Sequence, residues 1–290
     1  MNASPLTSVA ELSAILGDEN LLIVDCRFDL AAPPKGTRDP GRGAREYAEA
    51  HIPGAVYADL DRDLSDLSKL GLGRHPLPNA TAFSTVLARW GWTPSTHVVV
   101  YDDAGGALAA ARLWWMLRLV GARDVALLDG GWGAWKKAGL PVETACVPRA
   151  ATSVSVDFDA SEIVYTDELR ALRERERVLV LDARAAARFR GEIEPIDPVA
   201  GHIPGARNRP LNENLGMDGR FKPAAELRTE LLAVIGAPAP DAVVHSCGSG
   251  VSACQNLLAF EIAGLHGSRV YAPSWSGWIA DPINPVERGS

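Results

Sequence analysis

The chain repeats itself, and this repetition constrains its fold more than any other feature. Four landmarks of the first half return in the second half in the same order. They are residues 22–27 and 179–184, 51–55 and 202–206, 98–102 and 242–246, and 132–135 and 275–278. Four ordered matches make chance implausible, so we infer that one structural unit has been duplicated.

Each copy alternates short apolar runs rich in β-branched residues with segments of helical periodicity. This alternation predicts an α/β fold with a mostly parallel sheet covered by helices on both faces. A length of 290 residues suits two such domains. We place the first domain at residues 1–145 and the second at 161–290. Residues 146–160 contain no clear periodicity and are interpreted as the linker.

A glycine-rich loop at residues 247–252 carries the strongest functional signal. It follows a β-branched apolar run and precedes an amphipathic pattern, so Cys247 is expected at the end of a strand with a helix N-terminus behind it. Gly248 and Gly250 let successive backbone N–H groups converge, and those donors with the helix dipole would favour a thiolate. An inert, buried thiol is the alternative interpretation of the same local pattern.

The two copies differ at this loop. Alignment of the preceding strands places Asp103 opposite Cys247. An aspartate cannot take up and pass on sulfur as a thiolate can, so the first domain is predicted to be catalytically silent.

Charge and cysteine content exclude several classes of function. The net charge is −7 and basic residues form no run, which argues against nucleic acid or an anionic membrane as a partner. No apolar stretch has membrane-spanning length, and the polar N-terminus lacks a secretory signal pattern. Four cysteines without a Cys-x-x-Cys pair predict neither a disulfide framework nor a zinc site. We therefore expect a cytoplasmic protein.

The combination of Asp-x-Arg, His-Ile-Pro-Gly-Ala, the cysteine loop and Trp-x-x-Trp resembles the tandem-domain rhodaneses, which are thiosulfate and 3-mercaptopyruvate sulfurtransferases. The resemblance runs from about residue 9 to residue 286. It implies two tandem rhodanese-like domains, each a mostly parallel sheet flanked by helices. The uncharged loop is similar to that of the mercaptopyruvate branch, and the resemblance implies that it binds the donor through Gly248, Gly250, Val251 and Ser252.

The same resemblance implies further site residues. It assigns Ser249, His75 and Asp61 to a set in which the histidine polarises the serine and the aspartate fixes the histidine tautomer. It also assigns Arg188 to the donor carboxylate, which a guanidinium can bind in a bidentate manner.

One position departs from the mercaptopyruvate pattern. Asp197 stands where those enzymes place a second arginine, and an acidic residue there resembles the thiosulfate branch. A carboxylate would repel an anionic donor unless it points away, and Arg209 is a candidate to compensate for it. The donor thus stays open between 3-mercaptopyruvate and thiosulfate.

The implied reaction moves the sulfane sulfur of 3-mercaptopyruvate through a Cys247 persulfide to a small thiol, thioredoxin or cyanide, with no metal or organic cofactor. Thiosulfate:cyanide sulfur transfer and a non-catalytic sulfur-carrier or interaction module are the alternatives. A cysteine phosphatase is disfavoured, since Ala253 occupies the place where such enzymes need an arginine.

Overall fold

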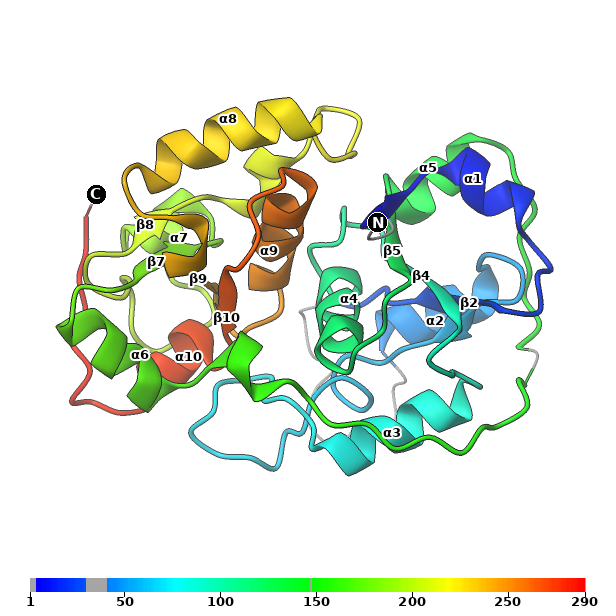
Figure 1. Ribbon diagram of the computed structural model, residues 1–290, viewed down its shortest axis with the longest axis horizontal. Helices are drawn as coiled ribbons and strands as arrows, with labels where there is room; N and C mark the ends of the chain where they lie inside the picture. Colours follow the sequence, from blue (N-terminus) through cyan, green and yellow to red (C-terminus); the bar gives the residue numbers. More distant parts are fainter. Residues whose placement is uncertain (1–3, 30–40, 147, 290) are drawn as a thin grey trace. The chain divides into compact units, whose positions relative to one another are not determined.

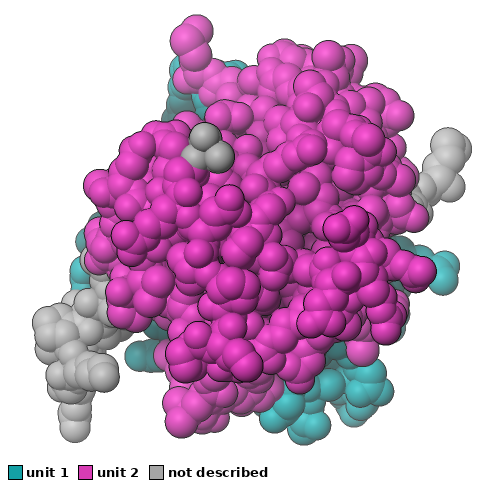
Figure 2. Space-filling model, turned by 90° about the vertical axis from the view of Figure 1, so that its left-hand side faces the viewer, with its two compact units in different colours: residues 1–65, 78–158, 218–220 teal, residues 66–77, 159–217, 221–290 magenta. Residues whose placement is uncertain are grey.

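The computed structural model describes residues 4–29, 41–146 and 148–289, so residue 147 of the predicted linker lies outside it. The chain forms two compact units (Figure 2). Unit 1 comprises Met1–Ser65, Pro78–Phe158 and Asp218–Arg220, and unit 2 comprises Asp66–Leu77, Asp159–Met217 and Phe221–Ser290. Residues 66–77, which we assigned to the first domain, therefore pack with the second unit, and they carry His75.

Unit 1 is built on a five-stranded parallel sheet in the order β1-β5-β4-β2-β3. Figure 1 labels β5, β4 and β2 of this sheet. Its strands are β1 (Leu6–Thr7), β2 (Leu21–Asp25), β3 (Val56–Tyr57), β4 (His97–Tyr101) and β5 (Val125–Leu128). Its helices are α1 (Val9–Ala14), α2 (Arg42–Glu49), α3 (Ala80–Arg89), α4 (Ala110–Leu119) and α5 (Gly131–Lys137). Helices α1, α2 and α5 share one core with the sheet, while α4 contacts β4 and β5.

Unit 2 repeats this topology, with its five-stranded parallel sheet in the order β6-β10-β9-β7-β8. Its strands are β6 (Ile163–Val164), β7 (Leu179–Asp182), β8 (Arg207–Asn208), β9 (Val243–Ser246) and β10 (Arg269–Tyr271). Its α-helices are α6 (Thr166–Glu174), α7 (Ala186–Phe189), α8 (Ala224–Ile235), α9 (Ala253–Ile262) and α10 (Ser274–Trp278), and its 3₁₀ helices are η1 (Ala160–Glu162), η2 (Leu211–Asn214) and η3 (Pro240–Ala242). The predicted fold class is confirmed. Among the described residues, no helix combines the length and apolar character needed to cross a membrane.

The duplicated Asp-x-Arg landmark forms the same buried ion pair in both units. Arg27 Nη2 lies 2.6 Å from Asp25 Oδ2, and Arg184 Nη2 lies 2.8 Å from Asp182 Oδ2. All four side chains are buried. Each arginine thus neutralises a carboxylate at the end of a central strand, where an unpaired buried charge would be strongly destabilising.

The strand register corrects the predicted counterpart of Cys247. The last residues of β4 and β9 pair with the equivalent aspartates of β2 and β7, so the residues that follow directly, Asp102 and Cys247, occupy the same position. The prediction of Asp103 is wrong by one residue. It is wrong because the alignment matched Val98 with Ala242, whereas the strand pairing makes Val98 equivalent to Val243, and similarity between two apolar runs does not fix their register.

In unit 1 the loop encloses the carboxylate of Asp102. The carboxylate accepts hydrogen bonds from the N–H groups of Ala104, Gly106, Leu108 and Ala110 at 2.9, 2.8, 3.2 and 3.4 Å. Burial raises the pKa of Asp102 although these bonds favour its charged form. Unit 1 therefore holds a carboxyl group, hydrogen-bonded by its own loop, where unit 2 holds a thiol.

Candidate active site

Cys247 begins the loop directly after β9, and its side chain is almost completely buried. The N–H of Gly250 donates to its Sγ at 3.2 Å, and the hydroxyl of Ser274 lies 3.9 Å from the same atom. The Ser274 hydroxyl oxygen also accepts the N–H of Cys247 at 3.1 Å. The sulfur thus faces hydrogen-bond donors from its own loop and from α10, as expected of a site that holds a sulfur anion.

These donors decide the ionisation of the thiol. Burial by itself would raise the pKa of Cys247, but hydrogen bonds from the Ser252 hydroxyl and from the N–H groups of Ser249 and Ala253 outweigh it and lower the pKa. The nearby Asp182 opposes this shift. A lowered pKa increases the fraction of thiolate, which is the nucleophilic form.

The loop is shaped by close backbone contacts that only glycine permits at one position. Gly250 has a φ of 77°, and a Cβ there would lie 2.1 Å from the carbonyl oxygen of Ala272. Val251, the next loop residue, is buried, and its carbonyl accepts the N–H of Cys254 at the start of α9. The tight turn therefore directs the loop N–H groups back toward the sulfur.

Helix α10 holds the loop from its other side. The N–H of Trp275 donates to the carbonyl of Cys247, and the N–H of Ser276 donates to the carbonyl of Gly248, each at 3.0 Å. With both carbonyls paired to α10, the loop N–H groups stay turned toward the thiol.

The structure brings Ser249 and His75 together. His75 Nδ1 and Ser249 Oγ are hydrogen-bonded at 2.8 Å, and both side chains are buried. Asp61 lies in unit 1, where its N–H donates to Asp59 Oδ1 at 2.9 Å. Its role beside His75 stays a prediction.

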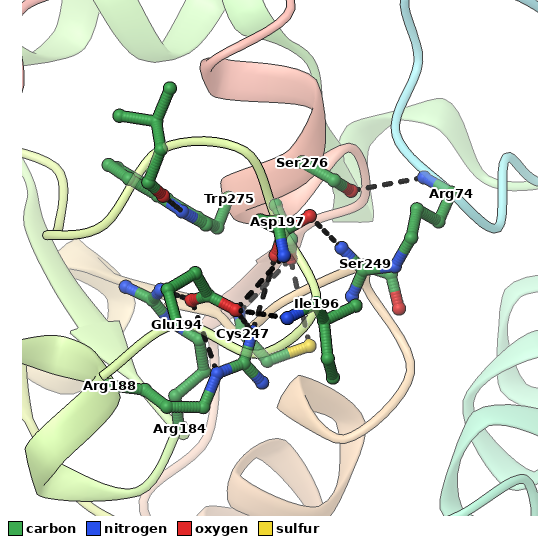
Figure 3. A network of polar contacts seen from close by, with 12 residues as sticks. Arg74, Arg184, Arg188, Glu194, Ile196, Asp197, Cys247, Ser249, Trp275 and Ser276 are labelled. Atoms are coloured by element: carbon green, nitrogen blue, oxygen red, sulfur yellow. Dashed lines mark hydrogen bonds and ion pairs between the residues drawn. The ribbon is translucent and has the colours of Figure 1, made fainter. Parts of the chain in front are cut away.

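Arg188, in the last turn of α7, lies close to the cysteine loop. Both of its terminal nitrogens lie 3.8 Å from where a Cβ on Gly248 would stand. Its Nη2 donates to Glu194 Oε1 at 2.6 Å and to Asp197 Oδ2 at 3.3 Å, and its Nε donates to Glu194 Oε2 at 3.2 Å (Figure 3). The guanidinium is thus oriented by two acidic side chains.

A second arginine at the loop, Arg74, was missed by the sequence analysis. Its Nη2 lies 2.8 Å from the position of a Cβ on Gly248, and its Nη1 forms an ion pair with Asp197 Oδ1 (Figure 3). Its only sequence signal was its place beside His75. It supplies the second cation that we sought in Arg209, whose Nη2 instead donates to Glu230 at 2.6 Å.

Glu194 was also missed, and it fixes the segment that carries Asp197. Its Oε1 accepts the N–H groups of Ile196 and Asp197 at 3.0 Å each, as well as the bond from Arg188. Burial would raise the pKa of Glu194, but the bonds from Arg188 and from these two N–H groups outweigh it and lower the pKa. Glu194 is therefore a fixed anion that positions Arg188.

A buried histidine, His245, lies in β9 two residues before Cys247. Burial lowers the pKa of His245 to about 3. Its Nε2 is hydrogen-bonded to Ser268 Oγ at 2.9 Å, and its Nδ1 has no hydrogen-bond partner within the described ranges. The folded protein therefore keeps this imidazole neutral, whereas the unfolded chain protonates it near pH 6.5.

This difference predicts a pH-dependent stability. Since the unfolded state binds the proton first, the contribution of His245 is complete above pH 6.5 and is lost as the pH falls toward 3, at about 1.4 kcal/mol per pH unit. His245→Gln, which can still bond to Ser268, should flatten the fall in free energy of unfolding measured by urea titration from pH 7 to pH 4.5. His266→Gln, at an exposed histidine, should leave the slope unchanged. An unchanged slope in His245→Gln would contradict the prediction.

Known proteins resemble the chain over nearly its whole length. The family described as "Rhodanese-like domain" matches residues 8–138 and 165–281. The "Probable 3-mercaptopyruvate sulfurtransferase" of Pseudomonas aeruginosa is 46% identical and covers 100% of both chains. A Mycobacterium tuberculosis protein whose name assigns it provisionally to the thiosulfate sulfurtransferases is 38% identical, over 98% of this chain and 97% of its own. The structure of 3-mercaptopyruvate sulfurtransferase from Leishmania major superposes with a TM-score of 0.82 at 33% identity, over 96% of this chain and 75% of that one. The chain therefore belongs to the rhodanese family, as a tandem-domain sulfurtransferase.

Proposed function

We propose that the enzyme takes sulfur from 3-mercaptopyruvate, holds it as a persulfide on Cys247 and passes it to a thiol or to cyanide. The observation that carries this proposal is the placement of two guanidinium groups beside an activated thiol. Arg74 and Arg188 both approach Gly248, the residue that follows the nucleophile. A 2-oxo-acid donor with one carboxylate and one sulfur fits a site that offers cations and a thiolate a short distance apart.

In the first step the Cys247 thiolate attacks the sulfur atom of 3-mercaptopyruvate. A sulfur–sulfur bond forms and the carbon–sulfur bond breaks, and its electron pair goes to carbon as the enolate of pyruvate. Ser249, hydrogen-bonded to His75, supplies the proton that converts the enolate to pyruvate, and His75 restores the proton to the serine. Asp61 would fix the tautomer of His75 in this scheme.

In the second step a thiolate or cyanide attacks the outer sulfur of the persulfide. The sulfur–sulfur bond breaks, and its electron pair returns to Cys247 as the thiolate. Between the steps the loop holds the persulfide anion through N–H groups such as that of Gly250 and through Ser252. We propose a small thiol or thioredoxin as the acceptor and the cytoplasm as the place of reaction.

Thiosulfate is the second candidate donor, and Asp197 favours it because an acidic residue at this position resembles the thiosulfate branch. The charges themselves do not favour a dianion, since Arg74 and Arg188 are balanced by Asp197 and Glu194 to a formal charge of zero. The relative named for thiosulfate sulfur transfer agrees with this alternative. The loop itself carries no cation suited to a dianion, so we favour the monocarboxylate donor. The intact nucleophile likewise disfavours a non-catalytic sulfur-carrier module.

Removing one cation tests the donor. Arg74→Gln is expected to raise KM for 3-mercaptopyruvate by about 10- to 100-fold with a smaller change in kcat, because a charge-assisted hydrogen bond to the carboxylate contributes roughly 1.5–3 kcal/mol. Initial rates with cyanide as acceptor, read as thiocyanate, give both constants. The wild type should show the higher kcat/KM with 3-mercaptopyruvate.

Arg190→Gln is the matched control, because Arg190 is a surface arginine near Arg188 that pairs with Glu192. It should leave both constants unchanged. A higher kcat/KM with thiosulfate in the wild type would overturn the proposed donor. An unchanged KM in Arg74→Gln would remove this residue from the carboxylate site.

A further inference from the structure

Asp197 forms ion pairs with both arginines that an anionic donor would need as partners. Its Oδ1 is paired with Arg74 and its Oδ2 with Arg188 (Figure 3). Its side chain is only 3% exposed. The carboxylate therefore does not point away from the site, which was the condition under which it would be harmless. It lies where the donor's own carboxylate would bind.

Asp197 and Glu194 are held in different ways. Glu194 accepts two backbone N–H groups of its own segment in addition to Arg188, so it is built into the fold. The hydrogen bonds to the Asp197 carboxylate within the described residues come from the two arginine side chains alone. A ligand carboxylate could replace both of those bonds, so Asp197 is an exchangeable partner and Glu194 is a fixed one.

The segment around Asp197 is fixed by Glu194 and keeps the aspartate beside the two arginines. It connects α7 to β8 without regular secondary structure, and Gly191 and Gly201, near its two ends, both have positive φ values. A tethered group competes at an effective concentration in the millimolar range or above, so it can oppose a free anion even where each single contact is weak. The four side chains have a formal charge of zero while Asp197 is in place, and Arg74, Arg188 and Glu194 alone have a formal charge of +1 once it is displaced.

We propose that Asp197 is a tethered counter-anion that fills the donor carboxylate site in the resting enzyme and must be displaced before an anionic donor binds. This inference rests on the proposed function, since it takes Arg74 and Arg188 as the site of the donor's carboxylate. It assigns Asp197 a specificity-determining role: weakly bound anions are excluded, and the returning carboxylate promotes release of pyruvate. If Asp197 fills the site in nine molecules of ten, the apparent dissociation constant of a carboxylate ligand is raised about tenfold.

Binding of pyruvate, the product, tests this without turnover. In a Cys247→Ser background, isothermal titration calorimetry should show a Kd for pyruvate about tenfold lower in Asp197→Asn than in the parent. Asp167→Asn removes the same charge from a side chain that is 97% exposed and should leave Kd unchanged. Equal or weaker binding in Asp197→Asn would overturn the inference, because it would mean that Asp197 organises the arginines for the ligand.

Thiosulfate as a second ligand separates the two proposals. Pyruvate that binds the parent but is insensitive to Asp197→Asn would leave the donor site standing and reject the counter-anion. Thiosulfate binding that tightens in Asp197→Asn, with no detectable pyruvate binding, would retain the counter-anion and reject 3-mercaptopyruvate as the donor. Absence of binding by either ligand in both proteins would overturn both.

Discussion

Cys247→Ser is expected to lower kcat for sulfur transfer by at least about 10⁴-fold, because a hydroxyl at this place is neither ionised near neutral pH nor able to carry the sulfur atom. The loop donors that lower the pKa of the thiol do not bring an alcohol into the same range. Thiocyanate formation from 3-mercaptopyruvate and cyanide measures the loss. Intact-mass spectrometry after incubation with donor alone should show one added sulfur atom in the wild type and none in the variant.

The matched control is Cys146→Ser, which removes the exposed cysteine. It should retain wild-type kcat and the added sulfur. Transfer that persists in Cys247→Ser, or a sulfur adduct that maps to Cys146, would place the nucleophile elsewhere.

Gly250→Ala is expected to disrupt the loop in two ways. A φ of 77° costs a non-glycine residue about 1–2 kcal/mol, and a Cβ 2.1 Å from the Ala272 carbonyl oxygen forces the backbone to move. We expect the free energy of unfolding to fall by about 2–5 kcal/mol. Because the N–H of Gly250 donates to the sulfur, a displacement of about 1 Å should also lower kcat by roughly 10²-fold.

Gly205→Ala separates the two effects. Gly205 also lies in unit 2 with a positive φ of 73°, but a Cβ there meets nothing within 4 Å. In this control the free energy of unfolding should fall only by the cost of a positive φ, about 1–2 kcal/mol, and kcat should stay near the wild-type value. Chemical denaturation and steady-state rates give both quantities, and equal effects in the two variants would refute a role for the Ala272 contact.

The duplicated sequence was sufficient to predict the architecture. Each apolar run became a buried strand, and the same order of landmarks produced the same order of strands in both units. The register was less accessible, because both strands contain consecutive valines and their similarity tolerates a shift of one residue. The hydrogen-bonded pairing of β4 with β2 and of β9 with β7 fixes the register, and it places Asp102, not Asp103, at the position of Cys247.

The same division holds for the site. The sequence by itself predicted Cys247 as the nucleophile, because a cysteine followed by two glycines between a strand and a helix lets loop N–H groups converge on the thiol. Only the tertiary structure decided which charges surround it. Arg74 and Asp197 are 123 residues apart, and their ion pair exists because residues 66–77 fold onto unit 2. Local sequence specifies a turn, whereas the meeting of distant charges depends on packing between segments that no local pattern records.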